Sequence, residues 1–223
     1  RFDPGYLRPT SAESNSATVQ IPEQQALESA IYISDGFNLS EKLLLDGGVR
    51  FSMFNQFGPG TQYLYAPGMP LSVQNMTDSV NYSRGDVMKT YGGIEPRLSL
   101  RYLIGDHTSL KFGFNRIYQY LHLVTNTAAV APVDVWQSSS AYFKPQVGDQ
   151  LSLGYFMTSG KGAFEAFAEG FYKRVKNVLD YKDGAALILN PHPETAFIPG
   201  NAYSYGVELS VARVAGRLTG ALS

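Results

Sequence analysis

The chain has 223 residues, of which 44% are hydrophobic and only 17% are charged. Average soluble domains carry roughly 25% charged residues, and a disordered chain would be far more polar, so disorder is excluded. Eighteen basic and nineteen acidic residues leave a formal charge of −1, which gives no electrostatic reason to expect a nucleic-acid partner. The lack of cysteine excludes disulfide scaffolds and thiol catalysis.

Apolar and polar residues alternate along many segments with a period of two, which is typical of β-strands that have two different faces. In the segment 43–54, Leu45 and Phe51 fall on one face and Asp46 and Arg50 on the other. Taken in chain order, the alternation predicts strands at 26–34, 43–54, 94–102, 109–120, 150–157, 163–173 and 203–211, with an eighth beginning near Arg217.

The connections between these segments alternate between short and long. Short ones lie near 36–42, 104–108, 158–162 and 213–216, and long ones at about 55–92, 122–148 and 176–202. Soluble sandwiches have strands of about five or six residues and connections of about four to six, so this pattern is atypical of them. A transmembrane barrel explains it through short periplasmic turns, long outer loops and strands of about 9–11 residues. We therefore predict an all-β fold, an antiparallel transmembrane β-barrel whose apolar face touches lipid.

Two residues conflict with this pattern. Arg116 falls on the apolar parity, where a cation costs roughly 2–4 kcal/mol at the bilayer midplane, so we expect a bulge there or a place near the outer rim. Pro96 has no ladder donor, so one acceptor stays unmatched or the strand bulges. Several tyrosines lie at or near the ends of the predicted strands, and two explanations are open. They could form an aromatic girdle at the membrane boundaries, or they could reflect only the preference of tyrosine for strands. These residues are Tyr102, Tyr118, Tyr120, Tyr155, Tyr172, Tyr203 and Tyr205.

Five stretches, in order, resemble the barrel of a TonB-dependent outer-membrane receptor of the Bacteroidetes type: 26–35, 45–51, 94–102, 143–155 and 203–210. The resemblance implies a 22-stranded barrel of which residues 1–223 hold about eight strands. It also implies a plug domain that is absent from these residues. Because the chain starts at Arg1 without a signal segment, we expect it to be an internal piece of a longer protein. The resemblance further implies a location in the bacterial outer membrane and no enzymatic activity.

The same resemblance implies import of a scarce nutrient, such as a siderophore, cobalamin, an oligosaccharide or a peptide. The energy would come from the TonB–ExbB–ExbD system through the absent plug region, and in part of the family a surface lipoprotein covers the mouth of the barrel. Two alternatives stay open. One is a passive or structural barrel, such as a porin or adhesion scaffold, and the other is a soluble carbohydrate-binding β-sandwich, in which Leu98, Leu100, Val207 and Leu209 would pack in a dry centre.

Candidate ligand-binding residues lie in the predicted outer loops, where flat rings with hydroxyl or NH groups suit sugars or peptides. They are Tyr63, Tyr65, Tyr82 and Trp136, which could instead only pack the loops together. Charged residues on the lumen parity could contact a plug or pair across strands, and they are Glu95, Arg97, Arg101, Glu165, Glu169, Lys173 and Glu208. His107, His122 and His192 are scattered without ligand spacing, so neither a metal nor another cofactor is expected.

Overall fold

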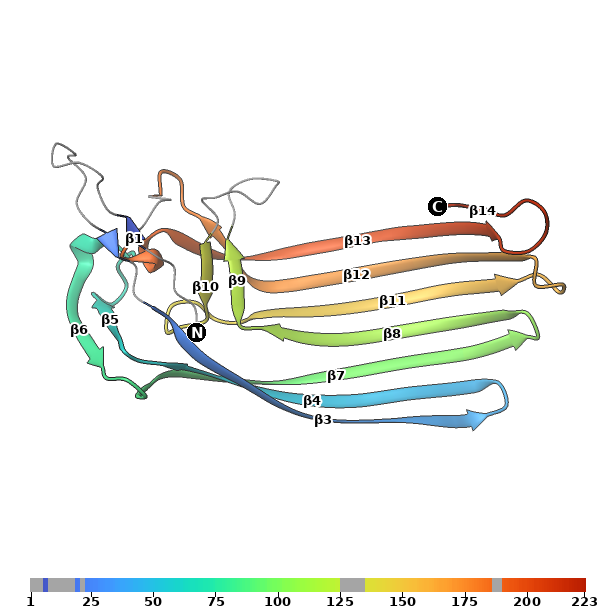
Figure 1. Ribbon diagram of the computed structural model, residues 1–223, viewed down its shortest axis with the longest axis horizontal. Helices are drawn as coiled ribbons and strands as arrows, with labels where there is room; N and C mark the ends of the chain where they lie inside the picture. The colour runs from blue at the N-terminus through green and yellow to red at the C-terminus, as the bar shows by residue number, and fades with distance from the viewer. Residues whose placement is uncertain (1–5, 8–18, 21–22, 125–134, 186–189) are drawn as a thin grey trace.

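The computed structural model describes residues 6–7, 19–20, 23–124, 135–185 and 190–223. Its main feature is one eight-stranded sheet in which every strand runs antiparallel to its neighbours and follows them in chain order (Figure 1). The strands are β3 (Gln25–Ser40), β4 (Leu43–Phe57), β7 (Val87–Gly105), β8 (Thr108–Gln119), β11 (Gln146–Thr158), β12 (Phe164–Tyr181), β13 (Phe197–Arg213) and β14 (Gly220–Leu222).

Smaller elements gather at one end of this sheet (Figure 1). Three two-stranded ladders pair β1 (Tyr6–Leu7) with β2 (Val19–Gln20), β5 (Gly60–Tyr65) with β6 (Met76–Tyr82), and β9 (Leu121–Val124) with β10 (Val135–Ser138). Two short 3-10 helices are η1 (Val73–Asn75) and η2 (Pro193–Thr195). Among the described residues, no helix is both long enough and apolar enough to cross a membrane.

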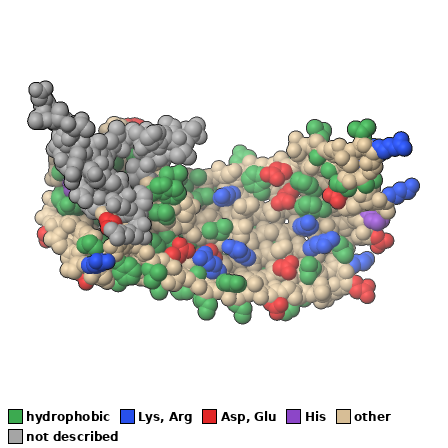
Figure 2. Space-filling model, viewed as in Figure 1, with side chains coloured by type: hydrophobic (Ala, Val, Ile, Leu, Met, Phe, Trp, Pro, Cys, Tyr) green, Lys and Arg blue, Asp and Glu red, His purple; other side chains and the backbone are tan. Residues whose placement is uncertain are grey.

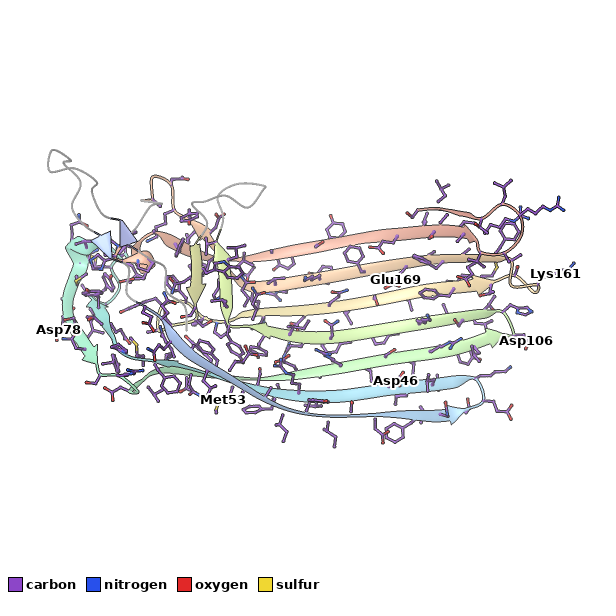
Figure 3. All side chains as sticks on the ribbon, viewed as in Figure 1. Asp46, Met53, Asp78, Asp106, Lys161 and Glu169 are labelled. Atoms are coloured by element: carbon purple, nitrogen blue, oxygen red, sulfur yellow. The ribbon has the colours of Figure 1, made fainter. Side chains whose placement is uncertain are left out.

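The sheet has a turn end and a loop end. Lys161 and Asp106 lie at the turn end, and Asp78 lies at the loop end (Figure 3). The strands are longer than the alternation predicts, because their ladders continue into segments that we expected to be loops. β3 runs on to Ser40, so its turn is only residues 41–42, and β12 runs on to Tyr181.

The two faces of the sheet differ as the alternation predicts. The register places Leu98, Phe114 and Leu151 side by side on one face, and Val207 and Leu209 on the same face are 72% and 63% exposed. No second layer of described residues covers them. The alternative of a soluble sandwich with a dry core between two stacked sheets is therefore wrong, and the predicted antiparallel sheet of a barrel fragment is confirmed. Figure 2 shows basic and acidic side chains spread over the broad sheet.

The buried apolar core lies at the loop end rather than within the sheet. Val124, Phe143, Leu179 and Phe197 form it, with Tyr181 packed against them. The rings of Phe143 and Phe197 meet edge to face with 5.6 Å between their centres. This core joins the β9 hairpin, the segment before β11 and the outer ends of β12 and β13 into one unit.

The ladder between β7 and β8 stops at the pair Arg97–Asn115, next to Pro96. Pro96 has no N–H group to donate to a neighbouring strand. Because the ladder ends at this position, no carbonyl group of β8 has to pair with Pro96. Beyond this point the ring of Tyr118 lies against the Cα of Gly93, and Tyr120 stacks on Phe54. Tyr120 is buried, so its predicted place in a lipid-facing girdle is wrong.

Arg116 has a partner that the sequence pattern did not identify. The β8–β11 register is continuous through Arg116, so the expected bulge is absent, and Asp149 lies directly opposite. Arg116 Nε and Nη2 donate to the two carboxylate oxygens of Asp149 at 2.6 and 3.1 Å. The pairing neutralises one charge on the apolar parity. Arg116 is the ninth residue of β8 from the turn end, and its place near the outer rim stays a prediction.

Candidate functional site

Among the described residues, the polar face of the sheet holds one network of ion pairs. Arg50 on β4 lies opposite Glu95 on β7, and its Nη1 donates to both carboxylate oxygens of Glu95 at 3.0 Å. Its Nη2 donates to Glu28 on β3 at 3.1 Å. Glu95 is 0% exposed, so the guanidinium compensates a fully buried carboxylate and ties three strands together.

The other six predicted lumen charges have no ion-pair partner among the described residues, although all lie on the polar parity. Glu169 and Glu208 lie directly opposite each other, and like charges in that position destabilise a sheet. Arg101 likewise faces Lys111. The remaining members of the set are Arg97, Glu165 and Lys173. Pairing among the predicted lumen charges is therefore absent, and Arg50, which the prediction omitted, is the partner of Glu95.

The polar face is also hollowed. A cavity of about 670 Å³ is lined across five strands by residues that include Asp46, Gly48, Arg97, Asn115 and Gln150. Glycines and short polar side chains leave this space because no long side chain fills it. A second cavity of about 510 Å³ lies nearer the turn end and has both basic and acidic lining residues, among them Arg101, Lys111 and Glu165.

At the loop end, a cluster of polar aromatic residues joins three connections. We call it the loop junction, and it comprises Tyr63, Tyr65, Tyr142, His192 and Glu194. Tyr65 Oη donates to Glu194 Oε1 at 2.5 Å, Tyr142 Oη donates to the carbonyl oxygen of Tyr63, and the rings of Tyr63 and His192 meet edge to face at 4.6 Å. The junction fixes the β5–β6 hairpin against η2.

Burial shapes the proton affinities at the loop end. Burial, followed by the hydrogen bond to Glu194, raises the pKa of Tyr65, and burial and then the charge of Glu194 raise the pKa of Tyr142. Burial lowers the pKa of His122 to about 4. The Nε2 atom of His122 lies 3.2 Å from Ser139 Oγ, and its Nδ1 has no partner. His122 is therefore neutral at pH 7.

The predicted ligand residues occupy different environments. Tyr63 and Tyr65 are half-buried in the loop junction, and Tyr82 is half-buried opposite Gly60 on β5. Trp136 on β10 is 42% exposed. Sequence reasoning missed Tyr142 and Glu194 because nothing in their local pattern distinguishes them from other loop residues. Within the described residues, no group of three or more His, Asp or Glu side chains could hold a metal ion.

An antiparallel sheet with an apolar outer face, a charged hollowed inner face, short turns at one end and long packed loops at the other defines the class of outer-membrane β-barrels. The family model for the TonB-dependent receptor-like β-barrel matches residues 2–222. The chain therefore belongs to this family. Its members are outer-membrane receptors and transporters, which confirms the expected location and the expectation that the chain is not an enzyme.

Solved structures with the same fold agree. The FrpB iron transporter from Neisseria meningitidis has 12% identity and a TM-score of 0.54, over 90% of this chain and 25% of that one. The Serratia marcescens hemophore receptor HasR, in complex with its hemophore HasA and heme, has 11% identity and a TM-score of 0.55, over 87% and 32%.

The ferripyoverdine receptor of the outer membrane of Pseudomonas aeruginosa, bound to ferripyoverdine, has 13% identity and a TM-score of 0.53, over 92% of this chain and 23% of that one. The chain thus spans about a quarter to a third of the length of these three structures. None of the curated proteins compared with it matches.

Proposed function

We propose that this chain is one part of the barrel wall of a receptor that captures a scarce nutrient outside the cell and imports it with energy from TonB, ExbB and ExbD. The loop end would face the outside and the turn end the periplasm. The charged inner face carries this proposal. Six charges there lack ion-pair partners within the described residues, and the Glu169–Glu208 pair is repulsive, so a body inside the barrel that supplied counter-charges would stabilise this face.

Such a body would be a plug domain encoded elsewhere in the complete receptor. A passive porin-like barrel has no plug, and its lumen charges contact water. The two functions are therefore distinguished by whether transport needs an energised inner membrane. The structures described above include an iron transporter, a hemophore receptor in complex with its hemophore and heme, and a receptor bound to ferripyoverdine. For this chain, an iron chelate, cobalamin, an oligosaccharide or a peptide is each compatible with a tyrosine-rich loop end, and a surface lipoprotein could cover the mouth.

Trp136 is the residue best placed to contact cargo, because it is the most exposed of the four candidate aromatics and stands on a hairpin at the loop end. Tyr63, Tyr65 and Tyr82 would contribute hydroxyl groups from the neighbouring β5–β6 hairpin. A minority of interface residues, enriched in tryptophan, tyrosine and arginine, each cost more than about 1 kcal/mol of binding energy when they are truncated to alanine. We expect Trp136→Ala to weaken cargo binding by about fivefold or more, and Leu121→Ala on the same hairpin to leave it unchanged.

The test uses the complete receptor in cells that depend on it for one nutrient at a time. Uptake that stops when the proton-motive force is collapsed, and that falls in the Trp136→Ala variant at limiting nutrient, supports the proposal. Uptake that continues in de-energised cells and is proportional to concentration without saturation would show a passive barrel instead. Growth on a nutrient that needs no receptor serves as the control for both.

A further inference from the structure

Charges of opposite sign stand at the two ends of one row on the inner face. The row crosses five adjacent strands, and its members lie directly opposite one another in the register. We call it the dipolar row, and it comprises Arg101 on β7, Lys111 on β8, Gly154 on β11, Glu169 on β12 and Glu208 on β13. Glu169 is labelled in Figure 3. The row thus has a basic half on β7 and β8 and an acidic half on β12 and β13.

An aromatic ring stands between the two halves. The Phe156 ring lies over Gly154, where a Cβ atom would be only 2.6 Å from the ring carbon Cε2. Lys111 Nζ lies 4.0 Å from the centre of this ring, and the ring also stacks on Phe167. None of the four charges of the row has an ion-pair partner within the part of the chain that the structure describes. Both halves can therefore bind a group from outside the wall.

Each half of the row is repulsive by itself, because like charges directly opposite each other destabilise a sheet. An anion would relieve the repulsion between Arg101 and Lys111, and a cation would relieve the repulsion between Glu169 and Glu208. The cavity of about 510 Å³ is lined by Arg101, Lys111 and Phe156, so there is room for a ligand beside the basic half. A ligand that satisfies the whole row carries an anionic end, a cationic end and a middle that can contact an aromatic ring.

The spacing of the strands sets the length of this ligand. Lys111 and Glu169 are two strand spacings apart, and Arg101 and Glu208 are four apart. At about 4.8 Å per spacing, these separations are about 10 and 19 Å. An extended peptide advances about 3.3 Å per residue, so peptides of about three to six residues span them.

We propose that the dipolar row binds a short peptide with free ends, whose carboxylate lies on the basic half and whose ammonium lies on the acidic half. A peptide amino end has a pKa of about 8 and its carboxyl end one of about 3.5, so both ends are charged at pH 7. A neutral oligosaccharide would leave both halves unpaired, and an anionic iron chelate would match only the basic half. The inference names a cargo class for the proposed function and rests on it, because cargo reaches this face only in a receptor that imports it.

The test measures import of a mixed-sequence hexapeptide library at limiting concentration, by the complete receptor, in energised cells that lack general porins. Glu169→Gln/Glu208→Gln removes the acidic half, and Arg101→Gln/Lys111→Gln removes the basic half. Both variants relieve a repulsion, so neither should impair folding. Exposed ion pairs are weak individually, and we expect each double variant to import free-ended hexapeptides about fivefold more slowly.

Peptides with blocked ends show which half contacts which end. Acetylation removes the ammonium, so it should slow import by the unmodified receptor about fivefold and should slow Glu169→Gln/Glu208→Gln no further. Amidation removes the carboxylate and should in the same way have no added effect in Arg101→Gln/Lys111→Gln. The control Glu41→Gln/Asp183→Asn removes two exposed carboxylates outside the row, and its import of every library should equal that of the unmodified receptor.

Three results would overturn the inference. Effects of end-blocking and of the variants that multiply would show that the row does not contact the peptide ends. Equal slowing of a ferric chelate and of the hexapeptides in both double variants would assign the row to the plug instead. Energised uptake of another nutrient without any import of hexapeptides would refute the peptide class and leave the proposed function intact, whereas uptake that never needs energy would refute the proposed function itself.

Discussion

Replacing Gly93 by alanine would test the packing that closes the wall above the end of the β7–β8 ladder. A Cβ atom at Gly93 would lie 2.5–2.6 Å from three ring carbons of Tyr118. The ring cannot easily retreat, because Tyr118 stacks on Tyr120 and Tyr120 stacks on Phe54. Tyr120 Oη also lies 2.8 Å from the Oγ atom of buried Ser52. Overpacking of this kind costs about 1–3 kcal/mol, and we expect the free energy of unfolding to fall by that amount.

Gly92→Ala is the matched control, since a Cβ atom there meets Phe51 at an ordinary 3.4 Å. The assay is urea unfolding of the complete receptor in phospholipid vesicles, followed by tryptophan fluorescence. Gly92→Ala should stay within about 0.5 kcal/mol of the unmodified receptor, as surface-type substitutions do. Adding Tyr118→Leu should recover most of the loss in Gly93→Ala. An equal loss in both glycine variants, or no recovery with the smaller side chain, would refute the packing argument.

Two further predictions use the same protein. Glu95→Gln removes the fully buried charge that Arg50 binds, so we expect the free energy of unfolding in the urea assay to fall by about 1.5–3 kcal/mol. Glu208→Gln should leave this free energy unchanged, because it relieves the repulsion with Glu169. Equal losses in the two variants would contradict this reasoning. Because burial lowers the pKa of His122, the folded hairpin of β9 and β10 favours the neutral imidazole. We therefore expect the free energy of unfolding of this hairpin to be highest above about pH 6.5 and to fall as the pH drops toward 4, by up to roughly 3 kcal/mol. Hydrogen exchange of residues 121–124 at pH 7 and 5 measures this decline, and a His122→Phe variant should lack it.

Much of the wall was predictable because a period of two needs no knowledge of the partner strand. Within 163–173, Phe167 and Phe171 have the same parity as the charged residues, and their neighbours in the sheet explain why. Phe167 lies on the polar face because it stacks on Phe156 at 5.5 Å. Phe171 lies there because Gly206 on β13 has no side chain, and a Cβ atom at Gly206 would lie only 3.0 Å from the Phe171 ring. Alternation identifies the face, while cross-strand partners decide which side chains that face tolerates.

Side-chain contacts that depend on the register between two strands could not be predicted from the sequence. The partnership of Arg116 with Asp149 links residues 33 positions apart, and the pairing of Arg50 with Glu95 links residues 45 apart. Both need the alignment of two strands to within one residue. The loop junction is harder still, since Tyr65 and Glu194 are 129 residues apart and meet only through tertiary packing. The outer strand ends differ from the prediction because the ladders of β4, β7, β12 and β13 continue beyond the alternating segments.

The early end of the β7–β8 ladder divides the upper wall into two panels. One consists of β3, β4 and β7 and the other of β8, β11, β12 and β13, and below Arg97 they share continuous hydrogen bonds. Above that level, the described residues connect the two panels through side chains, which include Tyr118 against Gly93 and the Tyr65–Glu194 hydrogen bond of the loop junction. Separation of the panels at the outer rim would therefore break these side-chain contacts but no backbone hydrogen bond between β7 and β8.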